Sequence, residues 1–123
     1  MFLVRFVLLF LATCSAHAAI TGEDYAALAN DPARREAVRA YVNGVGAAYE
    51  SLDVDIKIHK KGARLYCQPE SLVMREQNYI DILEARLREI AQMKRDMPFM
   101  KDYVAIIEPE LLRGLQKTFP CTK

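Results

Sequence analysis

Apolar residues along this chain recur mostly in steps of three and four, which places them on one face of a helix. The pattern is clearest over residues 72–91, where glutamates and arginines separate leucines and isoleucines. It predicts a helix that starts at Cys67, with Pro69 in the first turn, where the missing N–H of proline costs nothing. The helix should end at Met97, because the residue before Pro98 disfavours the helical conformation.

The same period continues from about Phe99 to Phe119 and predicts a second helix. Pro109 lies inside this segment, so we expect a kink or a short break near Glu108. Only a short loop separates the two predicted helices, which makes them antiparallel neighbours. The start of the first helix and the end of the second should then lie side by side.

Two further helices are expected closer to the N-terminus. The pattern predicts a short helix at about residues 21–29 and a longer one over residues 30–52, with one apolar stripe. Asn30 or Asp31 can cap the longer helix, and Pro32 suits its first position.

Two glycines, Gly44 and Gly46, interrupt the longer of these helices. Each one weakens a helix by roughly 1 kcal/mol. We expect them to allow close packing against a neighbouring helix. The alternative, a phosphate-binding loop, lacks the strand that should precede it.

The segment between the helices has a different period. Over residues 54–59, valine and isoleucine alternate with charged residues and histidine, which is typical of a half-buried strand. We therefore expect a short β-hairpin, or else an ordered loop, at about residues 53–67. The fold class that follows is mainly α, a small bundle of about four helices.

The N-terminus has the pattern of a cleavable signal peptide. Arg5 precedes a short apolar run, and small residues at Ala16 and Ala18 predict cleavage after Ala18. Residues 1–18 would then be a leader, and residues 19–123 one exported domain. The alternatives are a short membrane anchor, a buried N-terminal helix, or lipid anchoring at Cys14. No later segment is apolar enough to cross a membrane.

The charge balance argues against polyanionic partners. Residues 19–123 contain 16 basic and 16 acidic residues, because Arg5 is the only charged residue of the leader. A neutral chain is a poor candidate for binding nucleic acid or an anionic membrane surface. Charged helical stretches such as residues 84–89 are interpreted as solvated surfaces with pairs between successive turns.

Two cysteines, Cys67 and Cys121, remain after cleavage. In an exported chain such a pair is interpreted as one disulfide, with free thiols or intermolecular pairing as alternatives. A bond between them fits the side-by-side helix ends predicted above. A zinc site would need more ligands, and His59 is the only histidine left.

The exported chain is poor in groups that could carry catalysis. His59 lies in a run of lysines, where a solvated surface histidine is the simplest interpretation. The more specific alternative is a catalytic general base. We therefore expect a binding protein that has no catalytic residues, metal or cofactor, and a leftover apolar helix face would allow a homodimer. Two irregular places could contact a partner. One is a loop where apolar residues lie beside charges, which could instead cap the helical core, and the other is the basic tip of the expected hairpin. The candidate contacts are Lys94, Arg95, Asp96, Met97, Phe99, Met100 and Lys101 in one loop, and His59, Lys60 and Lys61 in the other.

Four short pieces occur in an order that resembles a known family. They are "YVNGV", "LYCQP", Gln77 and the terminal "GLQKTFPC", and together they extend over about residues 38–121. This set is similar to the Rap/Tai-type immunity proteins. Met74 and the charged "DVDIKIHKK" segment depart from the usual pattern of that family.

The resemblance implies a small helical periplasmic protein with one disulfide. Characterised members bind and block peptidoglycan amidase toxins that are delivered by type VI secretion, and some act as dimers. The leading hypothesis is therefore a periplasmic immunity protein with a cognate amidase as its partner. The alternative is a periplasmic acid-stress chaperone or structural protein.

Overall fold

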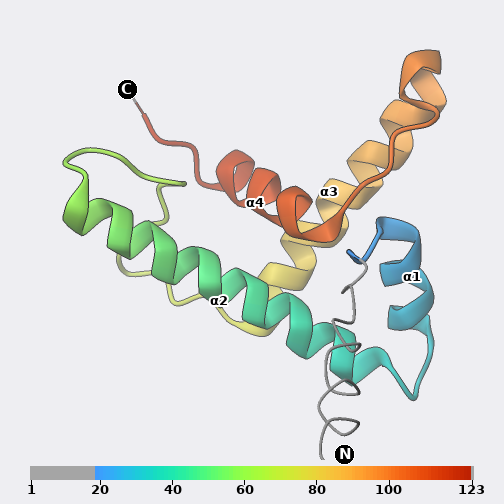
Figure 1. The fold of residues 1–123 in the computed structure, drawn as a ribbon, viewed down its shortest axis with the longest axis horizontal. Helices are drawn as coiled ribbons and strands as arrows, with labels where there is room; N and C mark the ends of the chain where they lie inside the picture. Colours follow the sequence, from blue (N-terminus) through green and yellow to red (C-terminus); the bar gives the residue numbers. More distant parts are fainter. Residues whose placement is uncertain (1–18, 123) are drawn as a thin grey trace, which may run out of the picture.

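Four α-helices and one short 3-10 helix make up the fold in a computed structural model, which describes residues 19–122 (Figure 1). The expected mainly helical class is confirmed, and residues 19–122 contain no β-strand. The predicted leader, with Cys14 and Ala18, lies outside the described residues. The elements are α1 (Gly22–Asn30), α2 (Arg35–His59), α3 (Glu76–Asp96), η1 (Pro98–Met100) and α4 (Ile107–Thr118).

The core lies where α2, α3 and α4 meet. Val42 of α2, Leu83 of α3 and Leu115 of α4 are almost completely buried there. Tyr25 joins the same cluster from α1. Val42, Leu83 and Leu115 belong to the apolar stripes that the sequence pattern predicts, so burial of those stripes assembles the bundle.

The short first helix begins as predicted. Its cap is reciprocal, because the Asp24 amide donates to Thr21 Oγ1 at 3.1 Å and the Thr21 amide donates to Asp24 Oδ2 at 3.2 Å. The start of α1 is also tied to the segment before α4. Gly22 N donates to Ala105 O at 2.9 Å, and Thr21 and Ile106 form an isolated antiparallel bridge.

The second helix starts later than expected. Asn30, Asp31 and Pro32 lie at the turn between α1 and α2, and Arg34 is the residue before the first helical one. The Asn30 side chain donates back to Ala26 O at 2.8 Å. Asp31 Oδ1 accepts from the Ala33 amide at 3.0 Å, so it shapes the turn and does not cap α2.

The predicted hairpin is absent, because α2 continues through residues 53–59. Asp53 is buried, whereas Val54 and Ile58 are exposed. Residues 49, 53 and 56 follow the helical period, and their side chains face inward or lie half-buried. The short valine–isoleucine alternation fitted a strand by chance. The alternative, an ordered loop over residues 53–67, is present only from residue 60, and this loop continues to residue 75.

The third helix begins at Glu76, nine residues after the expected start at Cys67. Pro69 lies in a turn in which the Leu72 amide donates to Pro69 O at 3.0 Å. Leu72 and Val73 are exposed and do not extend the buried stripe. The helix ends at Asp96 with Met97 as its C-cap, as Pro98 predicts.

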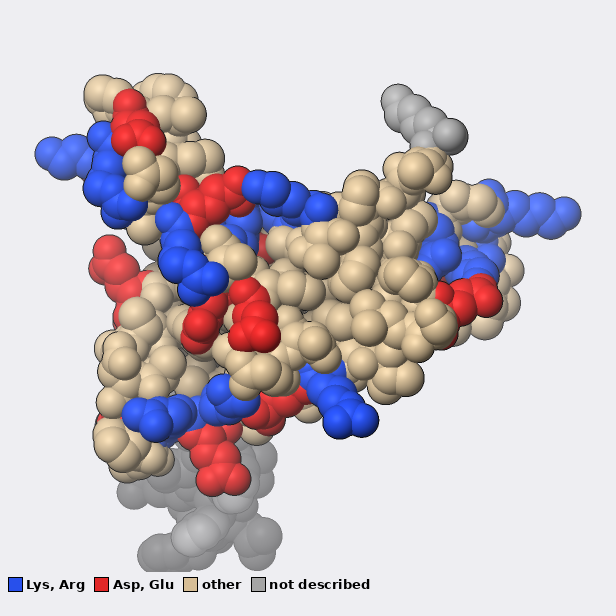
Figure 2. Space-filling model, turned by 180° about the vertical axis from the view of Figure 1, so that it is seen from behind, with Lys and Arg blue, Asp and Glu red and all other residues tan. Residues whose placement is uncertain are grey.

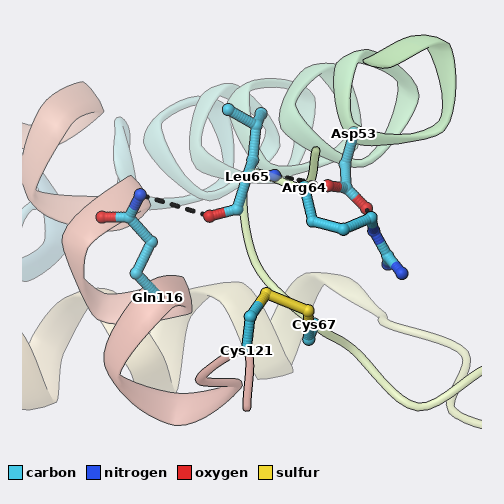
Figure 3. Close-up of a disulfide and its surroundings, with 6 residues drawn as sticks. All are labelled: Asp53, Arg64, Leu65, Cys67, Gln116 and Cys121. Carbon is cyan, nitrogen blue, oxygen red and sulfur yellow. Dashed lines mark hydrogen bonds and ion pairs between the residues drawn. A yellow bond between two sulfur atoms is a disulfide. The ribbon is translucent and has the colours of Figure 1, made fainter. Parts of the chain in front are cut away.

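The predicted disulfide between Cys67 and Cys121 is present, and the two Cα atoms lie 4.9 Å apart (Figure 3). Next to it, Cys67 N donates to Phe119 O at 2.8 Å. The bond joins the end of α4 to the middle of the irregular loop, and not to a helix start as expected. Loop 60–75 is thus fixed to the C-terminal segment.

The expected helix from Phe99 to Phe119 is divided. After η1 the chain is extended over residues 103–105, and α4 starts only at Ile107. Pro109 lies in the first turn of α4, where its missing N–H has no partner to lose. The break therefore comes before Glu108.

The two glycines of α2 differ in their surroundings. A Cβ atom at Gly46 would lie 2.4 Å from the ring of Tyr79 on α3, so only glycine allows this approach. A Cβ atom at Gly44 would have no neighbour within 4 Å. The predicted close packing is confirmed for Gly46 and wrong for Gly44.

Candidate functional site

The end of α3 projects from the rest of the molecule and carries most of the predicted contact residues (Figure 1). We call residues 94–101 the α3 tip. Phe99 is 80% exposed and Met97 is 39% exposed, which is unusual for large apolar side chains. The remaining predicted contacts of this segment, Lys94, Arg95, Asp96, Met100 and Lys101, surround them.

The α3 tip is a succession of hydrogen-bonded turns. Met97 N donates to Met93 O at 2.8 Å, and Met100 N donates to Met97 O at 2.9 Å. Tyr103 N donates to Met100 O at 3.0 Å as the chain turns back. The exposure of Phe99 is therefore built into an ordered segment, and little conformational entropy would be lost when it contacts a partner.

A buried carboxylate fixes the segment that returns from the α3 tip. Glu110 of α4 is fully buried and accepts hydrogen bonds from Tyr103, Arg113 and Arg86, the last at 2.8 Å. Burial alone would raise the pKa of Glu110. The hydrogen bonds from Tyr103 and Arg86 and the charges of both arginines outweigh it and hold that pKa below its usual range.

This network corrects the interpretation of residues 84–89 as a solvated surface. Arg86 is only 20% exposed and bridges Glu110 and Glu89, and Glu89 also pairs with Lys117. Glu84 accepts from the Tyr25 hydroxyl at 2.9 Å. Arg88 is the residue of this stretch that behaves as predicted, with a loose pair to Glu84 one turn away.

A groove of about 700 Å³ lies at the base of the projection, between α1, α3 and residues 103–105. The Tyr25–Glu84 hydrogen bond closes part of it. Apolar side chains line most of the remaining wall, among them Ala26 and Ala29 of α1, Leu87, Ile90 and Ala91 of α3, and Val104. The sequence did not predict this groove, because it depends on how α1 packs beside α3.

The second predicted contact region, His59, Lys60 and Lys61, lies at the end of α2, far from the α3 tip (Figure 1). All three side chains are exposed. His59 Nε2 is 3.3 Å from Asp55 Oδ1, one helical turn away. The structure therefore does not bring the two predicted contact regions together.

Loop 60–75, which carries Cys67 of the disulfide, offers a further apolar surface that the sequence did not single out. Val73 is 75% exposed and Leu72 is 37% exposed. Independently of these two residues, Figure 2 shows a broad area of uncharged side chains on one face of the molecule, with charged groups around it. The sequence pattern did not indicate this surface, because the helix predicted from Cys67 placed Leu72 and Val73 on a buried stripe.

Residues 19–122 show neither a metal-binding cluster nor a membrane-spanning helix. No group of three or more histidine, cysteine, aspartate or glutamate side chains in this part of the chain is arranged to hold a metal ion. No helix in the same range is both long and apolar enough to span a bilayer. Comparison of the chain with protein-family models, curated proteins and solved structures finds no match.

Proposed function

We propose that this chain is a periplasmic immunity protein that inhibits a peptidoglycan amidase of type VI secretion. The observation that carries the proposal is Phe99, which is 80% exposed at the end of an ordered projection. The α3 tip would enter the active-site cleft of the amidase and exclude its substrate. The rest of the bundle would hold the tip in place.

The chemistry of the α3 tip suits a protein partner. Aromatic and arginine side chains dominate the energy of protein interfaces, and Phe99 and Arg95 are both exposed here. Lysines and Asp96 around the apolar centre match the polar rim that surrounds an interface core. The Glu110 network supports the same role, because it fixes the returning segment before a partner arrives.

The disulfide favours a periplasmic location, and the sequence resemblance favours the immunity-protein class. A Cys67–Cys121 bond persists in an oxidising environment such as the periplasm. The ordered pieces "YVNGV", "LYCQP" and "GLQKTFPC" resemble the immunity family. Two of these pieces contain the bonded cysteines, so they support the fold more directly than the partner.

The test uses the exported protein and the amidase toxin that is encoded beside its gene. The wild-type protein should bind the amidase and stop its hydrolysis of peptidoglycan. Phe99→Asp should weaken binding by about 30-fold or more, because it places a charge at the centre of the interface. The matched control is Val73→Asp, an equally exposed apolar position outside the α3 tip, which should leave binding unchanged.

Two results would contradict the proposal. One is an exported wild-type protein that neither binds nor inhibits that amidase. The other is equal loss of binding in Phe99→Asp and Val73→Asp, which would show that the α3 tip has no special part.

One observation favours a second candidate, an acid-responsive periplasmic chaperone. Glu110 holds two arginines and Tyr103 together in a buried network that depends on its negative charge. Protonation in strong acid would break this network and expose apolar surface for client proteins. A dye such as ANS should then bind on acidification, and protection of unrelated proteins would appear only at low pH. A protein that binds no dye in acid argues against this candidate.

A further inference from the structure

The groove between α1, α3 and residues 103–105 has no part in the proposed function, and its size is that of a small-molecule site. Its volume is about 700 Å³. Sites for small ligands usually occupy roughly 300 to 1,000 Å³ and are lined mainly by apolar side chains. The α3 residues that line the groove extend from Glu84 to Lys94, which is about 15 Å along the helix axis. The groove is therefore long enough for an extended chain.

The walls of the groove are fixed before any ligand arrives. On the α1 side, Tyr25 is only 4% exposed, and its hydroxyl donates to Glu84 Oε1 at 2.9 Å. On the returning segment, the Tyr103 hydroxyl donates to the buried carboxylate of Glu110. Because these contacts already hold both walls, little conformational entropy would be lost when a ligand binds.

The apolar part of the wall restricts the chemistry of the ligand. Ala26 of α1, Leu87 of α3 and Val104 all line the groove, and Val104 is 60% exposed. A sugar or a nucleotide would lose hydrogen bonds to water against this surface without gaining others, which costs free energy. An acyl chain loses none and gains by leaving water. The wall therefore favours a ligand with a long apolar chain.

Four charged side chains also line the groove, and they differ in how far they are already paired. Glu84 accepts from Tyr25, and Arg88 Nη1 lies 3.9 Å from Glu84 Oε2. Glu23 lies in the first turn of α1, where the helix dipole stabilises a negative charge. Lys94 forms no ion pair with a carboxylate of residues 19–122.

The two basic side chains are thus the ones most available to a ligand. The side chain of Arg88 is 71% exposed and has only its loose pair with Glu84. Arg88 and Lys94 are about 9 Å apart along α3, so their long side chains can reach an anion that lies between them. An anionic head group complements these charges.

We propose that this groove binds a fatty acid. The acyl chain lies along the apolar wall, and the carboxylate is held by Lys94 and Arg88. The volume of the groove suits a single chain. This inference does not rest on the proposed function.

The length of the acyl chain sets the expected affinity. Each buried CH₂ group should strengthen binding roughly three- to fourfold. After the cost of immobilising the chain, we expect dodecanoate to bind with a Kd of roughly 10 to 100 μM. Decanoate, which is two CH₂ groups shorter, should bind about tenfold more weakly.

The first test places the ligand in the groove by filling the space. Isothermal titration calorimetry of the exported protein measures the Kd of dodecanoate and decanoate. Ala26→Trp should raise the Kd of dodecanoate by at least about tenfold, because its side chain takes the place of the ligand. The matched control is Ala27→Trp, an exposed alanine of the same helix that does not line the groove. Circular dichroism should show both variants folded, and Ala91→Phe fills the groove independently from α3.

The second test checks the sign of the head group. Dodecyltrimethylammonium has the same chain with a positive head, and should bind the wild-type protein at least about tenfold more weakly than dodecanoate. Lys94→Glu should raise the Kd of dodecanoate by roughly three- to tenfold. Lys61→Glu, at an exposed lysine outside the groove, should leave this Kd unchanged, and Glu23→Gln should not raise it.

Three results would overturn the inference. One is no binding of dodecanoate up to about 1 mM, which is at least ten times the expected Kd. Another is equal binding by the wild type and both groove-filling variants. The third is equal binding of the anionic and the cationic ligand. Ala26→Trp should still inhibit the amidase, and Phe99→Asp should still bind dodecanoate. Failure of the proposed function and failure of this inference can therefore be told apart.

Discussion

Two irregular segments of this molecule, loop 60–75 and residues 101–106, are anchored to the helices in different ways. Each one is held by a buried carboxylate. Asp53 accepts from the Leu65 amide at 2.6 Å and from Arg64 at 2.8 Å (Figure 3). Glu110 holds Tyr103 together with Arg86 and Arg113.

The difference lies in what supports each carboxylate. Loop 60–75 also has the disulfide, and Gln116 Nε2 donates to Leu65 O at 3.2 Å. Residues 101–106 have no covalent link. They depend on Glu110, on the hydrogen bond that Gly22 N donates to Ala105 O, and on the one that Ile107 N, just after the segment, donates to Ile20 O. One segment is thus stabilised mainly by a covalent bond and the other by buried charge. The predictions below test this division.

The largest effect should come from removing the disulfide. Cys67→Ser with Cys121→Ser opens a link across 54 residues, which the chain-entropy model values at about 4 kcal/mol. Urea unfolding should show this loss, and reduction of the wild-type protein should reproduce it. Hydrogen exchange should rise first around loop 60–75 and residues 118–122. Faster exchange at residues 101–106 alone would contradict the division.

The next largest effect should come from disrupting the Glu110 network. Glu110→Gln removes the anion that pairs with Arg86 and Arg113, and should lower the free energy of unfolding by about 3 kcal/mol. Thermal and urea unfolding measure the change. The matched control is Asp102→Asn, an exposed carboxylate within residues 101–106, which should change stability by less than about 0.5 kcal/mol. Similar losses in the two variants would show that burial of Glu110 has no special role.

A smaller effect is expected at the other carboxylate. Asp53→Asn keeps the shape of the side chain but removes its charge, and Arg64 is 25% exposed and can be hydrated. The disulfide still holds the loop, so the loss should be about 1 to 2 kcal/mol. Asp55→Asn is the exposed control two residues later. A loss larger than that of Glu110→Gln would reverse the comparison.

The smallest effect is the acid dependence of the charge network. The pKa of Glu110 is lowered in the folded protein, so its stabilisation is present above the unfolded pKa of about 4.3 and is lost as the pH falls through the folded value. Each pKa unit of lowering is worth about 1.4 kcal/mol. Unfolding measured from pH 7 to pH 3 should show that the difference in stability between the wild type and Glu110→Gln begins to shrink below about pH 4.3. A constant difference over this range would contradict the assignment.

The long helices could be predicted from sequence because their apolar stripes persist over several turns. Residues 53–59 were assigned wrongly because a short alternation fits both a strand and a helix. The decisive fact there is the hydrogen bond that the Leu65 amide donates to Asp53, and it depends on a loop that follows the helix. The start of α3 was missed for the same reason, since Cys67 is held by the end of α4 and not by its own helix.

The candidate site also has parts that local sequence predicts and parts that it does not. Local signals were sufficient for the α3 tip, because Met97 and Pro98 end a helix beside apolar residues. They were not sufficient for Glu110 and Arg86, which lie 24 residues apart in ordinary charged helical patterns. The groove beside α1 likewise depends on tertiary packing, which no single stretch of sequence describes.

The two glycines of α2 also imply how this protein tolerates mutation. Any side chain at Gly46 would collide with Tyr79, so a library of variants should recover almost nothing but glycine there under selection for folding alone. Gly44 has open space around it and should accept alanine under that selection. Two positions half a turn apart on one helix would then show, in a single selection, which glycine the packing requires and which it does not.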